Sequence, residues 1–163
     1  MRRFTALVFP ALAAILIGAA TIAQTAETAE PVEGAVERWR ADPTVVFAAS
    51  EIDLEEFLWI ARPIVVFAQT PADPAFIEQL TLLAARPETL ADRDVLLVTD
   101  TDPKNPSDIR LKLRPRGFML VLLDKDGAVN LRKPMPWSTR EISRSIDKMP
   151  IRQQEISEQP MLR

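Results

Sequence analysis

The residues from Arg116 to Arg132, RGFMLVLLDKDGAVNLR, constrain the fold more than any other stretch of this 163-residue chain. The unbroken apolar run from Phe118 to Leu123 is typical of a strand buried on both faces of a sheet. Asp126 and Gly127 follow, and both residue types tolerate the positive φ of a tight hairpin turn. The alternation from Ala128 to Arg132 then predicts a strand with one solvated face. The sequence therefore predicts a hairpin between a central strand and an edge strand.

Three apolar runs before the hairpin predict three more strands, over residues 44–48, 64–68 and 95–98. The first two runs, TVVFA and IVVFA, are too short to be a structural repeat. Two parallel strands with a crossover helix between them explain the similarity better. The third run has no polar alternation, which predicts a central parallel strand.

Helix signals separate the predicted strands. Ser50 can cap a helix that must end near Arg62, because the residue before a proline disfavours the α region. Asp73 and Pro74 start the second helix as N-cap and first helical residue. We expect its core face to consist of five apolar residues: Phe76, Ile77, Leu80, Leu83 and Ala84. Ser107 can cap a short helix over 108–113, although the apolar alternation there also fits a strand.

The last helix has the strongest start signal. Ser138 and Glu141 have the spacing of a capping box, with Trp137 and Ile142 at the hydrophobic-staple positions. Pro150 is expected to end this helix, and residues 157–163 form a polar tail. The element order is βαβαβαββα, which predicts an α/β fold with a mixed sheet covered by helices on both faces.

Composition excludes several kinds of chemistry. The chain contains no cysteine, no histidine and no tyrosine. Thiol–disulfide exchange is therefore impossible, and a zinc site lacks its preferred ligands. No histidine is present to activate a serine as a nucleophile. We therefore assign no catalytic, cofactor-binding or metal-binding residue and expect no cofactor.

Residues 1–23 resemble an export signal. Arg2 and Arg3 precede an apolar segment, and small residues at Thr21 and Ala23 suit a signal peptidase. The alternative is an uncleaved membrane anchor, but Pro10 interrupts a segment that is already short for a membrane span. We therefore expect a periplasmic or secreted protein, with residues 24–41 as a flexible lead-in to a domain over 42–156.

Charge is unevenly distributed over a chain whose net charge is −3. Residues 24–103 contain 5 basic and 16 acidic side chains, whereas residues 104–163 contain 13 basic and 7 acidic. The basic stretch consists of Lys104, Arg110, Lys112, Arg114 and Arg116. No aromatic residues alternate with it, so we expect no nucleic-acid binding. It could instead complement the acidic half, or make weak contact with an anionic partner or surface.

The element order is that of thioredoxin, and the hairpin resembles the corresponding thioredoxin strands. Thioredoxin's active site lies where the second strand meets its helix, here residues 69–74, and both thiols are missing. The cis-proline expected near Met119 is missing too. Scattered residues then resemble the thioredoxin-like domain of unknown function 4174, found in exported bacterial proteins and, in similar form, in extracellular sushi-repeat and coiled-coil-domain proteins. They are Trp59, Arg62-Pro63, Arg93-Asp94, Gly117-Phe118, Lys125-Asp126-Gly127, Leu131-Arg132, Ile146-Asp147, Met149-Pro150, Arg152-Gln153 and Glu155.

Two sets of side chains are candidates for chemistry or binding. Asp100 and Asp102 follow the third strand, where α/β folds bind ligands, and could hold a divalent cation or act as acid and base. The alternative, which we favour, is that they support turns beside the loop prolines. Arg62, Arg132 and Arg152 could bind a partner's carboxylates, or could be solvated cations.

The sequence and its resemblance predict an exported, non-catalytic thioredoxin-like module that binds another envelope or extracellular protein. The alternative is a carboxylate- or divalent-cation-dependent enzyme that uses the loop of Asp100 and Asp102. A third possibility is a structural component attracted to anionic surfaces through residues 104–116.

Overall fold

A computed structural model describes residues 34–158 of the chain. The predicted signal peptide, most of the lead-in and the last five residues lie outside this range. In chain order the elements are α1 (Ala35–Ala41), β1 (Val46–Ala48), the 3-10 helix η1 (Leu54–Phe57), β2 (Arg62–Phe67), α2 (Pro74–Ala84), α3 (Pro87–Ala91), β3 (Val95–Asp100), α4 (Asp108–Leu113), β4 (Met119–Leu123), β5 (Val129–Lys133), α5 (Thr139–Ile146) and α6 (Pro150–Glu158). Within residues 34–158, no helix has the length and apolarity that a membrane crossing requires.

The strands form one five-stranded sheet in the order β1-β3-β2-β4-β5. Strands β1 and β2 both pair in parallel with β3, and β4 pairs antiparallel with both β2 and β5. The predicted mixed sheet with a terminal hairpin is therefore confirmed, and its strand order is thioredoxin-like. The hairpin turn is also confirmed, because Gly127 has a φ of 81°.

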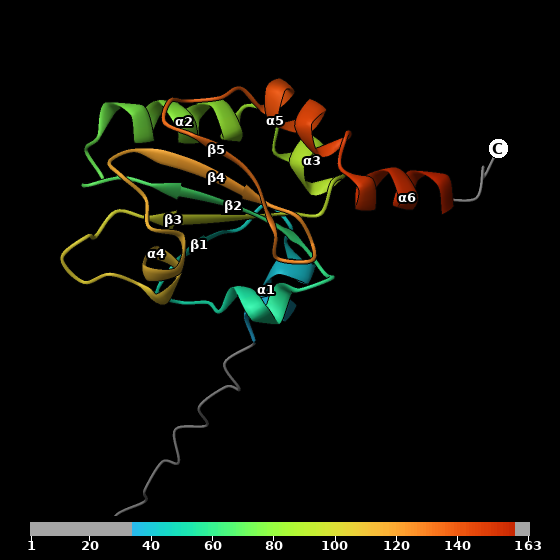
Figure 1. Cartoon of the computed structure of the whole chain (residues 1–163), viewed down its shortest axis with the longest axis horizontal. Helices are drawn as coiled ribbons and strands as arrows, with labels where there is room; N and C mark the ends of the chain where they lie inside the picture. The colour runs from blue at the N-terminus through green and yellow to red at the C-terminus, as the bar shows by residue number, and fades with distance from the viewer. Residues whose placement is uncertain (1–33, 159–163) are drawn as a thin grey trace, which may run out of the picture. The chain divides into compact units, whose positions relative to one another are not determined.

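Alternate residues of the central strands enter two separate cores. Ile64 and Val66 of β2 pack with α2, α3 and α5, whereas Val65 and Phe67 pack with α1, η1 and α4. Figure 1 shows the same layers, with α2, α3 and α5 over one face of the sheet and α1 and α4 over the other. Helices cover both faces, as predicted.

The predicted helix caps are mostly confirmed. Asp73, Ser107 and Ser138 each accept a hydrogen bond from the backbone of the helix that follows, and Ser138 and Glu141 form the capping box. The predicted core face of α2 is partly wrong. Ile77 and Ala84 are exposed. Gln79 is buried instead, and its side-chain amide bonds to both backbone groups of Trp137.

Three predictions about local structure are wrong. The segment after Ser50 forms only the short η1, which Asp53 caps, and Trp59 then adopts a left-handed backbone that ends the turn. Part of the lead-in is ordered, because α1 places Trp39 in the core, where its indole N–H donates to the carbonyl of Val95. Helix α5 already ends at Ile146, and Pro150 begins α6 instead of ending the helix before it, so residues 157 and 158 of the predicted polar tail are helical.

Candidate functional site

The carboxyl ends of β2 and β3 carry the first candidate site, and its carboxylates are bound within the fold. Asp100 is buried, and its Oδ1 accepts hydrogen bonds from Nη2 and Nε of Arg110 at 2.7 and 2.9 Å. Its Oδ2 accepts from the Ser107 hydroxyl at 2.7 Å. Arg110 also donates to the carbonyl of Ala68, just beyond β2. Asp100 therefore joins β3, α4 and the end of β2.

Asp102 has a different structural role. Its carboxylate accepts hydrogen bonds from the backbone N–H groups of Lys104 and Asn105 and from the Asn105 side chain. The hydrogen bonds from Asn105 lower the pKa of Asp102 below its ordinary value. Within residues 34–158, no group of three or more histidine, cysteine, aspartate or glutamate side chains is placed to hold a metal ion.

The basic stretch does not form one continuous surface. Arg110 is buried and pairs with Asp100 of the acidic half, which agrees with the interpretation that the basic stretch complements that half, so Arg110 is not part of an exposed basic surface. Lys104, Lys112, Arg114 and Arg116 are exposed, and Lys112 lies 3.6 Å from the Glu55 carboxylate. The predicted contact with an anionic partner now depends on these four side chains.

Residues 69–73, which correspond to the thiol-bearing segment of thioredoxin, form a loop before α2. The side chains of Gln69 and Thr70 are exposed, and they line a shallow hollow of about 360 Å³ together with the loop of Asp102. Asp73 caps α2, because its carboxylate accepts a hydrogen bond from the N–H of Ala75 at the start of that helix. This loop therefore offers polar surface without an acid–base pair.

The opposite end of the sheet contains a dense ionic cluster around Arg62, which we call the Arg62 cluster. Arg62 is the first residue of β2, and its side chain is 0% exposed. The antiparallel register that pairs Ile64 with Leu122 places it opposite Asp124, whose carboxylate lies 3.2 Å from Nε of Arg62. The other members are Asp94, Lys125, Arg152 and Glu155.

Glu155 of α6 joins three cations of this cluster. Its Oε1 lies 2.8 Å from Nη2 of Arg62 and 2.9 Å from Nζ of Lys125, and its Oε2 lies 3.1 Å from Nη1 of Arg152. Partial burial raises the pKa of Glu155, but the hydrogen bonds from these three cations outweigh burial and lower the pKa to about 2. The carboxylate is therefore ionised at any physiological pH.

A second ion pair lies beside the cluster and joins the segment after α3 to the C-terminal end of α5. Nε and Nη2 of Arg93 donate to the two carboxylate oxygens of Asp147 at 2.9 and 3.0 Å. Arg152 donates to the carbonyl of Asp92 in the same region. Together with the Arg62 cluster, these contacts hold the three helices at the amino-terminal edge of β2 and β3.

Two exposed apolar side chains lie near this end of the sheet. Trp59 is 69% exposed and Leu58 is 39% exposed. Trp59 has a φ of 63°, and its backbone N–H donates to the carbonyl of Lys125 at 2.7 Å. A Cβ at Gly127 would lie 3.0 Å from Leu58, so the glycine allows the hairpin to approach this loop closely.

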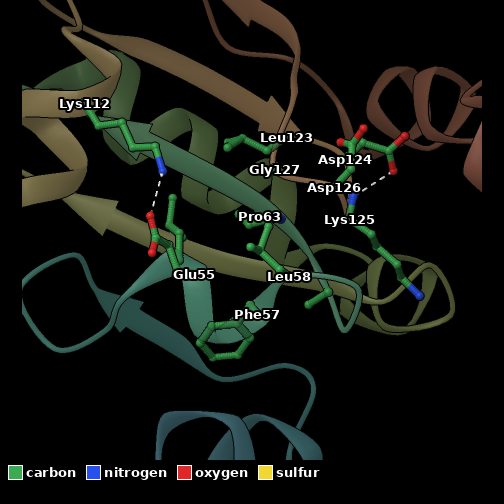
Figure 2. A pocket seen from close by; sticks show the side chains of 12 residues that line it. Glu55, Phe57, Leu58, Pro63, Lys112, Leu123, Asp124, Lys125, Asp126 and Gly127 are labelled. Atoms are coloured by element: carbon green, nitrogen blue, oxygen red, sulfur yellow. Dashed lines mark hydrogen bonds and ion pairs between the residues drawn. The ribbon is translucent and has the colours of Figure 1, made fainter.

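A small pocket lies between Leu58 and the hairpin, and we call it the hairpin pocket. Figure 2 shows Leu58 and Pro63 between Lys112 and Glu55 on one side and the turn at Asp124–Gly127 on the other. Its volume is about 150 Å³. The pocket can accept a small apolar side chain, and charged residues also line it.

Most of the residues that carried the family resemblance converge on this end of the sheet, whereas Gly117 and Phe118 precede β4 at the other end. The converging residues come from the η1–β2 loop, the β2 and β3 starts, the hairpin, α5 and α6, and they include Trp59, Arg62, Asp94, Lys125, Asp147, Arg152 and Glu155. The fold and these contacts define a thioredoxin-like domain without redox thiols. The family model "Domain of unknown function (DUF4174)" matches residues 53–155, and the chain belongs to this family.

Solved structures show the same fold. The reduced 2-Cys peroxiredoxin of Plasmodium vivax is 18% identical, with a TM-score of 0.50 over 64% of this chain and 85% of that chain. Chloroplastic thioredoxin z is 22% identical, with a TM-score of 0.49 over 62% of this chain and 90% of that chain. No curated protein matches the chain. At these identities the likeness concerns the fold alone.

Sequence reasoning missed the role of most residues in the Arg62 cluster. Arg62 and Arg152 were candidates for binding a partner, and they instead bind carboxylates of their own chain. Arg132, the third candidate, donates to the carbonyl of Leu113. The one available signal was the resemblance itself, because its scattered residues include charged residues of both signs.

Proposed function

We propose that the protein is an exported, non-catalytic thioredoxin-like module that binds another envelope or extracellular protein through the surface around Leu58 and Trp59. The observation that carries this proposal is the 69% exposure of Trp59 on a left-handed backbone. Its export rests on the sequence of residues 1–23, which has the features of a signal peptide.

The conformation of Trp59 has an energetic cost that the fold must offset. A left-handed backbone costs a non-glycine residue about 1–2 kcal/mol, and the hydrogen bond to Lys125 maintains it. Strain of this kind concentrates at functional sites. Tryptophan is also enriched among the residues that dominate protein–protein binding energy. The adjoining hairpin pocket can accept a side chain of the partner.

The absence of cysteine removes the redox chemistry of thioredoxins. The enzyme alternative requires Asp100 and Asp102 to be available to a substrate or cation. Asp100 is paired with Arg110, and Asp102 accepts hydrogen bonds from its own loop. These contacts favour the binding module over the carboxylate-dependent enzyme.

Affinity capture from native envelope extract, followed by direct binding to the purified partner, tests the proposal. Trp59→Ala is compared with Ile77→Ala, because Ile77 is exposed on α2 and away from the proposed surface. We expect wild type and Ile77→Ala to recover and bind the same protein. Trp59→Ala should weaken binding at least 10-fold, as expected for a hot-spot aromatic.

A second variant tests the basic stretch separately. It reverses the charge of Lys104, Lys112, Arg114 and Arg116 and keeps Arg110, because Arg110 is buried. If only this variant lost binding, the interface would be assigned to the basic stretch around α4 and not to the surface around Trp59. Equal binding by all variants, or capture of no protein by wild type, would contradict the proposed function.

A further inference from the structure

Helix α6 contributes no residue to either hydrophobic core, and the side-chain hydrogen bonds and ion pairs that link it to the rest of the domain are polar. None of its nine residues is buried, in contrast to α2 and α5. Figure 1 shows α6 following α5 and extending to one side of the sheet. Its links to residues outside α6 include the contacts of Glu155 with Arg62 and Lys125 and that of Arg152 with the carbonyl of Asp92. A helix held in this way can detach without exposing a hydrophobic core.

Among residues 34–158, Glu155 is the only side chain that accepts a hydrogen bond from Nη2 of Arg62. Nε of Arg62 donates to Asp124 and Nη1 donates to the carbonyl of Arg93, whereas Nη2 donates to Glu155. A buried donor without a partner is strongly unfavourable, and more so when it is charged. Detachment of α6 therefore leaves Nη2 of Arg62 to water or to another acceptor.

The geometry selects a carboxylate as that acceptor. Nη2 of Arg62 and Nζ of Lys125 approach the same oxygen of Glu155, at 2.8 and 2.9 Å. Two cations that converge on one oxygen favour an anionic acceptor, and charge-assisted bonds to carboxylate are the strong ones. Lys125 also accepts the N–H of Trp59 through its carbonyl, so this position adjoins the surface of the proposed function.

We propose that Arg62 and Lys125 form a carboxylate-binding site that Glu155 occupies within the chain, and that a carboxylate of the bound partner protein replaces Glu155. The identity of the partner as a protein rests on the proposed function, whereas the site itself does not. Because Glu155 is tethered, it competes at a high effective concentration. The partner carboxylate therefore gains occupancy only together with other contacts, such as those around Trp59.

Acetate is the first probe, and the full chain with Glu155→Ala is the test variant. The variant removes the internal carboxylate and leaves room for acetate. Thermal melting is measured at pH 7 in acetate and in chloride at equal ionic strength. We expect Glu155→Ala to lower the melting temperature by roughly 5 °C and acetate to restore at least half of the loss. Glu158→Ala is the matched control, because Glu158 is exposed and bonds only to Gln154 among the described contacts.

Two peptides then distinguish the source of the carboxylate. One contains internal glutamates and an amidated C-terminus, and the other has a free C-terminal carboxylate and no acidic side chain. We expect one of them to bind Glu155→Ala at least 10-fold more tightly than wild type, because the internal competitor is absent. Adding Lys125→Met to Glu155→Ala should remove this gain.

The proposed site would be refuted if acetate and chloride gave Glu155→Ala the same melting temperature. It would also be refuted if acetate raised the melting temperature of Glu158→Ala equally. If Glu155→Ala fails to fold, refolding yield in acetate against chloride replaces melting, and no gain in acetate is again negative. A negative acetate result would refute the carboxylate-binding site without affecting the proposal that a partner binds through Trp59. Acetate rescue without any captured partner would instead retain the site and reject the proposed function.

Discussion

Replacement of Asp100 by asparagine tests whether the loop after β3 is structural. Asp100 and Arg110 are each only 7% exposed, and they form a 2.7 Å ion pair. Breaking a buried pair by removing one charge costs about 3–5 kcal/mol. Arg110 keeps the carbonyls of Ala68 and Asp100 as acceptors, so we expect the lower end of this range, about 3 kcal/mol.

Urea denaturation followed by tryptophan fluorescence measures this loss. With a slope of about 1.5 kcal/mol per molar, the unfolding midpoint should fall by about 2 M. Asp102→Asn is the matched control in the same loop. Asp102 is exposed and accepts only local hydrogen bonds, so its replacement should cost less than about 1 kcal/mol.

A double-mutant cycle separates the pair from its surroundings. Asp100→Leu with Arg110→Met replaces both charges by apolar side chains, which leaves no unpaired buried ion. The double variant should be more stable than the sum of the single losses predicts, by about 2 kcal/mol. Additive losses, or a cost of Asp100→Asn below about 1 kcal/mol, would refute the assignment of Asp100 to a structural pair.

Three further predictions concern the other polar and strained positions. Glu155 has a folded-state pKa of about 2 against an ordinary value of 4.5. Its contribution to the free energy of unfolding is therefore complete above pH 4.5 and is lost as the pH falls towards 2. That difference in pKa corresponds to about 3 kcal/mol of free energy of unfolding, which solvent screening reduces to about 1–2 kcal/mol. Measurement of the free energy of unfolding against pH should show this loss in wild type and not in Glu155→Gln. Identical pH profiles for the two proteins would contradict the prediction. Trp59→Gly should raise the free energy of unfolding by about 0.5 kcal/mol, because relief of the left-handed backbone exceeds the added chain entropy; a loss above 1 kcal/mol in urea denaturation would show that Trp59 is structural. Gln79→Leu should cost about 2 kcal/mol by the same assay, because both backbone groups of Trp137 lose their partner, and an unchanged midpoint would contradict this role.

Much of the fold could be predicted because turn and helix-cap residues that are close in sequence specify the same elements that the structure contains. The hairpin, the capping box and the start of α2 each depend on residues close in sequence, and all three are confirmed. The helix expected after Ser50 failed for a non-local reason. Leu54, Phe57 and Ala61 do enter the core, whereas Leu58 is exposed. Trp59 donates its N–H to Lys125 of the hairpin instead of to the preceding turn. Apolar spacing alone cannot reveal that competing bond.

Helix α6 could not be predicted because its attachment is ionic. Hydrophobic periodicity detects helices that bury an apolar stripe, and α6 buries none of its residues. Pro150 was interpreted only as a stop signal, although proline is also favoured at the first position of a helix. What decides between these meanings is the contact of Glu155 with Arg62, 93 residues away in sequence.

Strand β2 explains why this domain keeps charged residues in its interior. Arg62 is its first residue, and Arg110 donates to the carbonyl of Ala68 immediately after its last. A guanidinium group therefore lies at each end of the strand, one beside the helices α3, α5 and α6 and the other beside α4. Apolar replacements could provide comparable stability, because a buried ion pair contributes little net free energy. They could not provide directional bonds, so we infer that the two arginines fix where the central strand ends and the surface loops begin. On this view Glu155 is the carboxylate of the Arg62 cluster that is open to exchange, because it alone comes from a helix with no buried residue.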